Sequence, residues 1–293
     1  MVDRRPLGNI LVATDFSAGA KRALERACRL PITPGCALTL LHVMPKVSLP
    51  FHERAERAVN SSLQAWAQEA QRSVAANVEV RVAIEAGQPF VQIGRRAEVE
   101  RADLVVLGRH GRRAWPREAL GSTADRLLRR GSTAVLVVVD APLDGYHHPL
   151  VAVDEEGSAA AAIALMARIA PEVHGALAIH VLDIDQLVLL SQYELPVPEL
   201  EKVWRSLADS TRRRIEAALD QIGDTDLDFD LRTVEGDPRR AILELAQAEQ
   251  ADLVAVGTHG RSGFRHLLLG SVAEAVIRGA QIDVLVVRAG PQR

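Results

Sequence analysis

Two short segments of the chain repeat one spacing of glycines and a serine. The segments read GRHGRRAWPREALGS and GTHGRSGFRHLLLGS. The shared positions are Gly108, Gly111, Gly121 and Ser122 in the first segment and Gly257, Gly260, Gly270 and Ser271 in the second. Glycine lets the backbone approach a ligand closely and turn where a β-carbon would not fit. A helix that begins at Gly-Ser presents unpaired N–H groups and a partial positive charge, which suit phosphate. The spacing therefore predicts two phosphate-binding loops.

Helix capping is the alternative explanation for the serines. Ser271 followed by Glu274 fits a capping box, and Ser122 with Asp125 is close to one. A cap explains neither the two earlier glycines nor their repetition after an apolar run, so we favour the phosphate interpretation. The sequence has no GxxxxGK[ST] segment, and no GxGxxG follows the first apolar run of either half. It is therefore not a P-loop protein, and the usual dinucleotide fold is disfavoured.

The two segments belong to a duplication of the whole chain. Gly257 follows Gly108 by 149 residues (257 − 108), and the other shared positions keep this offset. The stretch DAPLDGYHHP, residues 140–149, is rich in proline, glycine and polar residues and is typical of a linker. We therefore expect two tandem domains, residues 1–144 and residues 145–293.

Each half alternates short apolar runs with amphipathic segments. In the first half the expected strands cover residues 9–14, 37–43, 78–87, 103–108 and 133–139. The second half repeats the order through LVAVD, ALAIHVL, FDLRTVEG, DLVAVG and DVLVVR. Strands made almost entirely of Val, Leu, Ile and Ala are buried on both faces, as in parallel sheets covered by helices. Right-handed crossovers then give an α/β fold with a doubly wound sheet of about five strands in each half.

Composition limits the class of protein. Of the 293 residues 48% are hydrophobic and 25% charged, with a net charge of −3, as in a soluble globular protein. No apolar run reaches the roughly 18 residues of a membrane helix, and the N-terminus lacks the pattern of a signal peptide. Cys28 and Cys36 have neither disulfide nor metal-ligand spacing, which favours a reducing, cytoplasmic location. The basic residues crowd around one glycine loop without an aromatic platform, so we expect no nucleic-acid partner.

The order of these signals resembles the universal stress protein family. ILVATDFS, LLHV, ADLVVLGRHG and GTHGRSGFRHLLLGSVAE follow one another as in that family, and the resemblance covers the chain as two tandem copies. It implies a Rossmann-like five-stranded parallel sheet in each half, with strand order 3-2-1-4-5. It also implies ATP binding, and a pseudo-dimer in which the last strands of the two halves pair. A homodimer of two chains and a further protein partner are additional expectations.

The resemblance also assigns site residues. Asp15 and Asp154 would face the adenosine, and Val43 and Val181 would offer their backbone to the adenine. The phosphate loops would consist of Gly108, His110 and Gly111 in the first half and Gly257, His259 and Gly260 in the second. The helix starts that hold the phosphates would be Gly121, Ser122 and Thr123 in the first half and Gly270, Ser271 and Val272 in the second. Ala124 and Ala273 stand where the family usually has a small hydroxyl residue, so one phosphate hydrogen bond is lost at each site. The second site keeps Gly263, where the first has Ala114 before Trp115-Pro116, and is the better expected binder.

Three functions remain open. The favoured one is an ATP-binding regulator of a stress response, with ATP, ADP or AMP bound, Mg²⁺ accompanying the nucleotide, and at most slow hydrolysis. No nucleophile with a partner carboxylate is recognisable near the histidines, so we assign no catalytic residue and no metal site. The alternatives are a phosphoryl- or adenylyl-transfer enzyme on the same fold and a nucleotide-free dimerisation scaffold.

Overall fold

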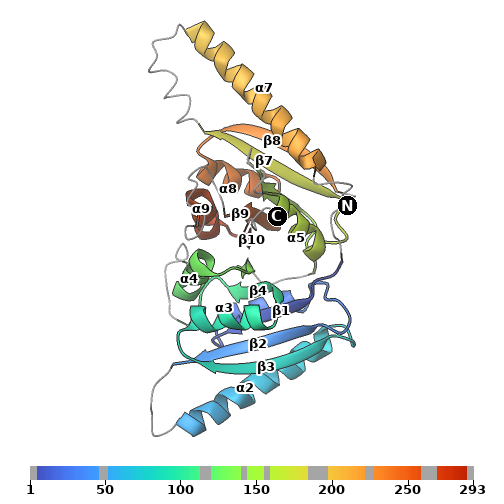
Figure 1. The fold of residues 1–293 in the computed structure, drawn as a ribbon, viewed down its shortest axis with the longest axis vertical. Coiled ribbons are helices and arrows are strands. Elements are labelled where there is room, and N and C mark those ends of the chain that lie inside the picture. Colours follow the sequence, from blue (N-terminus) through green and yellow to red (C-terminus); the bar gives the residue numbers. More distant parts are fainter. Residues whose placement is uncertain are drawn as a thin grey trace.

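The computed structural model describes residues 5–45, 52–112, 120–139, 144–154, 159–183, 197–221, 227–258 and 269–288. In these residues ten strands form a single sheet with the order β3-β2-β1-β4-β5-β10-β9-β6-β7-β8 (Figure 1). Each half thus has the strand order 3-2-1-4-5 that the resemblance implies. The α/β class and the doubly wound arrangement are confirmed.

The described part of the first half contains five parallel strands and four helices. The strands are β1 (Asn9–Thr14), β2 (Ala37–Met44), β3 (Glu79–Ala86), β4 (Ala102–Gly108) and β5 (Ala134–Val138). The helices are α1 (Ala18–Ala27), α2 (His52–Ser73), α3 (Pro89–Val99) and α4 (Ser122–Arg130). The central strands are buried because each of their side chains contacts a helix on one face or the other; Leu11 and Val12, adjacent in β1, are both fully buried.

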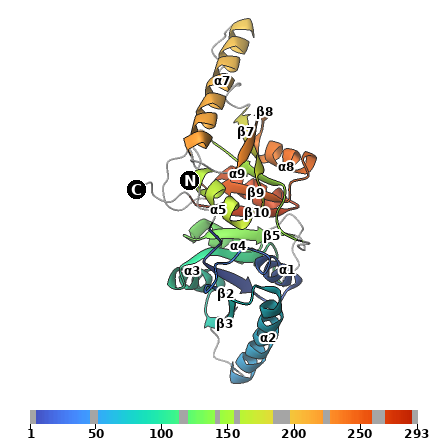
Figure 2. The ribbon, with the colours of Figure 1, turned by 90° about the vertical axis from the view of Figure 1, so that its right-hand side faces the viewer.

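The second half repeats this order. Its strands are β6 (Pro149–Ala152), β7 (Gly175–Asp183), β8 (Asp228–Gly236), β9 (Leu253–Gly257) and β10 (Asp283–Val287). Its described helices are α5 (Ala159–Ile169), α7 (Val197–Gln221), α8 (Pro238–Ala248) and α9 (Ser271–Gly279). The long helices α2 and α7 lie at opposite ends of the molecule (Figures 1 and 2). No helix among the described residues is both long enough and apolar enough to cross a membrane.

Helices cover both faces of the sheet, and each face has its own core. On one face Leu24 of α1 and Ile163 of α5 belong to one continuous apolar cluster. On the other face Leu127 of α4 and Val276 of α9 belong to a second cluster. Both clusters contain residues of the two halves, so the halves share their hydrophobic cores as well as their sheet.

The two halves join through their last strands. β5 and β10 pair antiparallel, with Leu136 opposite Leu285. The expected pairing of these strands is therefore confirmed, and it joins the two expected five-stranded sheets into one sheet of ten strands among the described residues. Backbone hydrogen bonds continue across the join because both edge strands are apolar and would otherwise expose unpaired N–H and C=O groups.

A buried polar cluster reinforces the join. Asp283 of β10 accepts hydrogen bonds from the Arg26 guanidinium at 2.9 Å, the Tyr146 hydroxyl at 2.7 Å and the Val139 amide at 2.9 Å. The Arg26 guanidinium also lies 4.1 Å from the centre of the Tyr146 ring. Burial raises the pKa of Asp283 even though these three donors oppose the shift. The partners make the buried carboxylate tolerable, since an unpaired charge here would cost several kcal/mol.

Candidate functional site

A pocket opens at the carboxyl ends of the strands of the first half, where β1 and β4 lie side by side. Its cavity volume is about 310 Å³. Strand order reverses between these two strands, and doubly wound sheets bind their ligands at this position. All eight residues predicted for the first site line the pocket, namely Asp15, Val43, Gly108, His110, Gly111, Gly121, Ser122 and Thr123. The structure thus brings together residues that lie more than 100 positions apart in the chain.

Asp15 fixes the loop that follows β4. Its Oδ1 accepts a hydrogen bond from the Ser17 amide at 3.0 Å, and its Oδ2 accepts one from the Arg112 amide at 2.7 Å. The first bond steadies the start of α1, and the second holds the glycine loop against it. Asp15 therefore shapes the pocket wall in addition to lining it.

Gly108 is required by packing inside the protein. A β-carbon on Gly108 would lie 2.5 Å from the carbonyl carbon of Gly19 in α1. A β-carbon on Gly19 would in turn overlap the carbonyl oxygen of His110. The expectation that Gly108 mainly leaves room for a ligand is therefore wrong, because the space it leaves is filled by the backbone of α1. The role of Gly19 was not predicted, since nothing in the sequence around it indicates contact with a loop some 90 residues further on.

Gly111 leaves space for the Asp15 side chain, and its backbone does not adopt the left-handed region. The described glycines with positive φ are Gly35, Gly87 and Gly236. A β-carbon on Gly111 would overlap the Oδ2 atom of Asp15. The expectation that a β-carbon would not fit here is confirmed, and the reason is the Asp15 carboxylate, which needs the space.

The N-terminus of α4 faces the pocket through its backbone. Gly121 is the N-cap residue and offers no side-chain acceptor to the first turn. Its own amide donates to the Arg109 carbonyl at 3.0 Å, which ties the loop to the helix. At the start of α9 the N-cap is likewise Gly270, and Glu274 pairs with Arg278. The capping alternative is therefore wrong for both serines, which sit one position inside the helix.

Two histidines border the pocket. His110 has its Nε2 atom buried and without a hydrogen-bond partner among the described residues. The His42 Nδ1 atom lies 2.8 Å from the Thr14 carbonyl oxygen, and the His42 ring stacks at 4.8 Å against Phe16. Phe16 has a φ of 63°, which is unusual for a bulky residue and occurs here between Asp15 and the start of α1.

Arg109 does not line the pocket. The arginines of this loop, residues 109, 112, 113 and 117, are expected from the sequence to attract phosphate. The Arg109 side chain is only 3% exposed, and its guanidinium donates to the Ala280 carbonyl at the end of α9. The expectation is therefore wrong for Arg109, which connects the loop of one half to a helix of the other. Arg112 lines the pocket, and residues 113 and 117 lie outside the described residues.

The second half places its predicted residues in an equivalent arrangement. Asp154 follows β6, Val181 lies in β7, Gly257 ends β9, and Gly270, Ser271 and Val272 stand at the start of α9. The Val153 carbonyl oxygen lies 2.9 Å from Nδ1 of His180, as the Thr14 carbonyl does from His42. His259, Gly260 and Gly263 lie outside the described residues, and so do the Ala114, Trp115 and Pro116 of the first loop.

The pocket also contains residues that the sequence did not assign, two of them from α3. Pro89 and Ile93 line the wall opposite the strand ends. Pro89 has a counterpart, Pro238, at the start of α8 in the second half. That repetition was the available signal for a site residue, but proline at the first turn of a helix is common for structural reasons alone.

Both halves of the chain match the same protein family. A family model described as the universal stress protein family matches the chain twice, over residues 6–139 and 145–288. The chain belongs to the universal stress protein family. Its two family matches correspond to the two halves of the ten-stranded sheet.

Other universal stress proteins resemble the chain over different lengths. One from Mycobacterium tuberculosis is 30% identical over 190 residues, which cover 64% of this chain; the chain spans only 62% of that relative's length. One from Mycolicibacterium smegmatis is 27% identical over 305 aligned positions, covering 95% of this chain and 96% of the relative. The crystal structure of a universal stress protein from Archaeoglobus fulgidus shares the fold, with a TM-score of 0.65 at 17% identity over 96% of this chain and 98% of the other.

Proposed function

We propose that each half binds an adenine nucleotide, with ATP as the favoured ligand, and that the protein is a nucleotide-dependent regulator in a stress response. One observation carries the proposal: a cavity of about 310 Å³ is lined by all eight residues predicted for the first site. This volume lies in the range of small-molecule sites, roughly 300–1,000 Å³. The proposed domains, residues 1–144 and 145–293, would each hold one nucleotide, and the protein would act in the cytoplasm through a protein partner.

The two ends of the pocket suit the two ends of a nucleotide. Leu41, Val43 and Ile93 supply an apolar surface for the adenine. The pairing of β2 with β1 ends at His42, so the backbone of Val43 extends beyond β1 and is available to the base edge. At the other end the first-turn amides of α4, from Ser122 onward, would receive the phosphates. The buried Nε2 of His110 would gain a partner from the same phosphates.

Binding without efficient turnover agrees best with the pocket. Asp15 is the one acidic residue in the described lining, and both of its oxygens already accept backbone hydrogen bonds. Fast phosphoryl transfer needs carboxylates that hold a metal and a group that positions the nucleophile. Mg²⁺ would accompany the nucleotide through its phosphates, and hydrolysis would be slow. Regulation would then follow from a difference in nucleotide affinity between two conformations.

The decisive experiment removes one amide donor and keeps the helix. Ser122 is the first residue of α4, and Gly121 before it has φ −58° and ψ 141°, which a following proline accepts. Proline is favoured at this helix position and lacks an N–H group. We expect Ser122→Pro to fold normally and to bind ATP at least about tenfold more weakly in the first half, since a hydrogen bond to a charged group contributes about 1.5–3 kcal/mol. Titration calorimetry measures this loss.

The second half provides the matched variant. Ser271→Pro stands in the same backbone setting, after Gly270 with φ −59° and ψ 147°. If both halves bind, each single variant weakens one site and the double variant weakens both, while Ser122→Ala removes only the hydroxyl. A wild-type chain that is folded but binds no adenine nucleotide would refute the proposal. So would two proline variants that bind as tightly as the wild type.

A further inference from the structure

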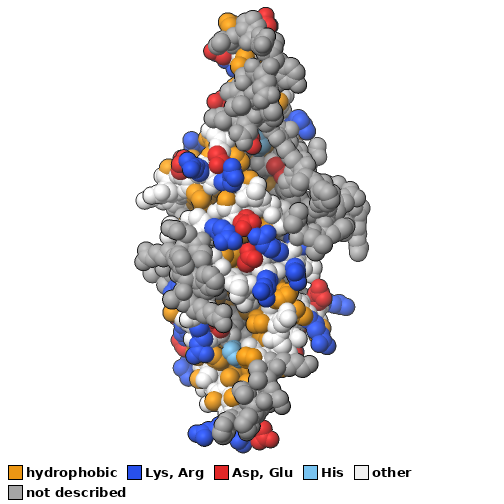
Figure 3. Space-filling model, turned by 90° about the vertical axis from the view of Figure 1, so that its left-hand side faces the viewer, with side chains coloured by type: hydrophobic (Ala, Val, Ile, Leu, Met, Phe, Trp, Pro, Cys, Tyr) orange, Lys and Arg blue, Asp and Glu red, His pale blue; other side chains and the backbone are white. Residues whose placement is uncertain are grey.

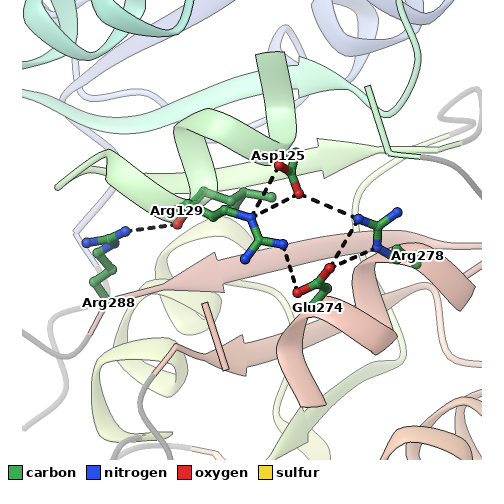
Figure 4. A network of polar contacts seen from close by, with 6 residues as sticks. Asp125, Arg129, Glu274, Arg278 and Arg288 are labelled. Atoms are coloured by element: carbon green, nitrogen blue, oxygen red, sulfur yellow. Dashed lines mark hydrogen bonds and ion pairs between the residues drawn. The ribbon is translucent and has the colours of Figure 1, made fainter. Parts of the chain in front are cut away.

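Helices α4 and α9, each of which begins at a proposed site, carry an equivalent pair of charges. Asp125 and Arg129 lie on α4, and Glu274 and Arg278 occupy the equivalent positions on α9, since 274 − 125 and 278 − 129 both equal 149. Figure 4 shows the four side chains meeting between the two helices. The network therefore spans the join between the halves.

Each carboxylate is contacted by its own arginine and by that of the other half. Arg129 lies 3.2 Å from Asp125 and 2.8 Å from Glu274. Arg278 lies 3.1 Å from Glu274 and 3.7 Å from Asp125. Hydrogen bonds to Asp125 and Glu274 raise the pKa of Arg129, so its charge is secure. On the face shown in Figure 3, positive and negative side chains gather in the middle of the molecule.

The two carboxylates stand close to where the phosphates would bind. Asp125 lies in the first turn of α4, and Glu274 lies in the first turn of α9. A negative charge there complements the helix dipole and so competes with a phosphate for the same partial positive charge. The side chains of Asp125 and Glu274 are 26% and 28% exposed, so solvent screens them only in part. A phosphate at either helix start needs this carboxylate to be neutralised.

We propose that each half supplies an arginine that supports the phosphate site of the other half. Arg278 of the second half adds positive charge beside Asp125 and the first site, and Arg129 of the first half adds it beside Glu274 and the second, each in addition to the arginine on the carboxylate's own helix. Both are positioning residues, since they act on the phosphate through a carboxylate. The inference rests on the proposed function and adds a dependence of each site on the opposite half.

A double-mutant cycle tests the proposal on the full chain. In the Ser271→Pro background the second site is expected to bind at least about tenfold more weakly, so titration calorimetry at low ATP concentration reports mainly the first site. We expect Arg278→Gln to weaken ATP binding about fivefold, the size of one uncompensated charge about a helix turn away in a partly screened site. In chains that also carry Asp125→Asn, Arg278→Gln should have no effect. Arg278→Lys should retain the affinity, because it keeps the charge.

The controls separate charge from folding. Arg212→Gln removes an equally charged side chain that pairs with Glu216 on α7, and it should leave ATP affinity unchanged. High salt should reduce the difference between wild type and Arg278→Gln, because screening weakens a charge effect and leaves a packing effect intact. The inference would be overturned if Arg278→Gln lowered ATP affinity equally in chains with Asp125 and in chains with Asp125→Asn, or lowered it in neither. A Ser271→Pro chain that binds no ATP at all would refute the proposed function of the first site, and the inference with it.

Discussion

The carboxylate of Asp15 accepts a hydrogen bond of 2.7 Å from the backbone amide of Arg112. The contact crosses from the end of β1 to the loop after β4, and Gly111 provides the space for it. Two elements almost 100 residues apart in sequence are thereby fixed at one side of the pocket. The contact holds the start of the loop against the end of β1.

Asp15→Asn should loosen the loop without removing a pocket atom. The amide side chain keeps one acceptor and loses the charge, so we expect about 1–2 kcal/mol less stability and about tenfold weaker ATP binding in the first half. Urea unfolding and titration calorimetry measure the two effects. Asp230→Asn is the matched control, since Asp230 pairs with Arg232 on the exposed surface of β8 and should be nearly neutral. Equal results for the two variants would contradict the role given to Asp15.

Gly108→Ala should destabilise the first half. The added β-carbon would lie 2.5 Å from the carbonyl carbon of Gly19, and backbone at both positions has little freedom to move. Overpacking of this kind costs about 1–3 kcal/mol. Gly145→Ala is the control, because a β-carbon there meets no atom within 4 Å. Urea unfolding of both variants compares them, and a Gly108→Ala chain as stable as Gly145→Ala would show that α1 can shift.

The glycine spacing predicted which residues meet at the pocket but not why each is glycine. A β-carbon on Gly108 would clash with Gly19, and one on Gly111 would clash with Asp15. These contacts arise only when α1 packs beside the loop. Arg109 shows the same limit. Its position in a basic loop indicated phosphate, whereas its contact with Ala280 depends on how the two halves dock. The positions of the strands were predictable because apolar periodicity is local, and their order and pairing were implied by the family resemblance. Side-chain partners across the join follow from neither.

Tyr146 should make stability fall at high pH. Burial, helped by the negative charge of Asp283, raises the pKa of Tyr146 well above 10.0. The unfolded chain releases this proton near pH 10, while the folded chain keeps it. The stabilising contribution is therefore complete below about pH 10 and declines as the pH rises toward the raised folded pKa. Each pH unit in that window should lower the free energy of unfolding by about 1.4 kcal/mol.

Tyr146→Phe isolates this effect. The variant loses the hydrogen bond to Asp283 and should be less stable at neutral pH. Its free energy of unfolding should then fall less steeply than that of the wild type above about pH 10. Urea unfolding at several pH values gives both slopes. Parallel slopes would mean that the phenol titrates equally in the folded and unfolded chains.

Cys28 should react slowly with alkylating reagents. Burial raises the pKa of its thiol from 9.0 to about 11. Since the thiolate is the reactive form, we expect about 100-fold slower alkylation of Cys28 at pH 8 in the folded chain than in urea. Mass spectrometry of the peptide that contains Cys28 measures the rate. A folded-state rate close to that in urea would show that the helix opens readily around this thiol.

Covalent fusion frees the two sites from having to be identical. In an assembly of two separate copies, any substitution at the join appears on both sides of the symmetry axis. Here Arg109 reaches across the join, while the equivalent position of the second loop holds Thr258 (258 − 109 = 149). The backbone amides of both residues keep the same bond, to Val138 and Val287 at 2.9 and 3.1 Å. If both proposed sites bind nucleotide, their affinities could diverge independently on one scaffold, and a single chain would then respond to two concentration ranges of its ligand.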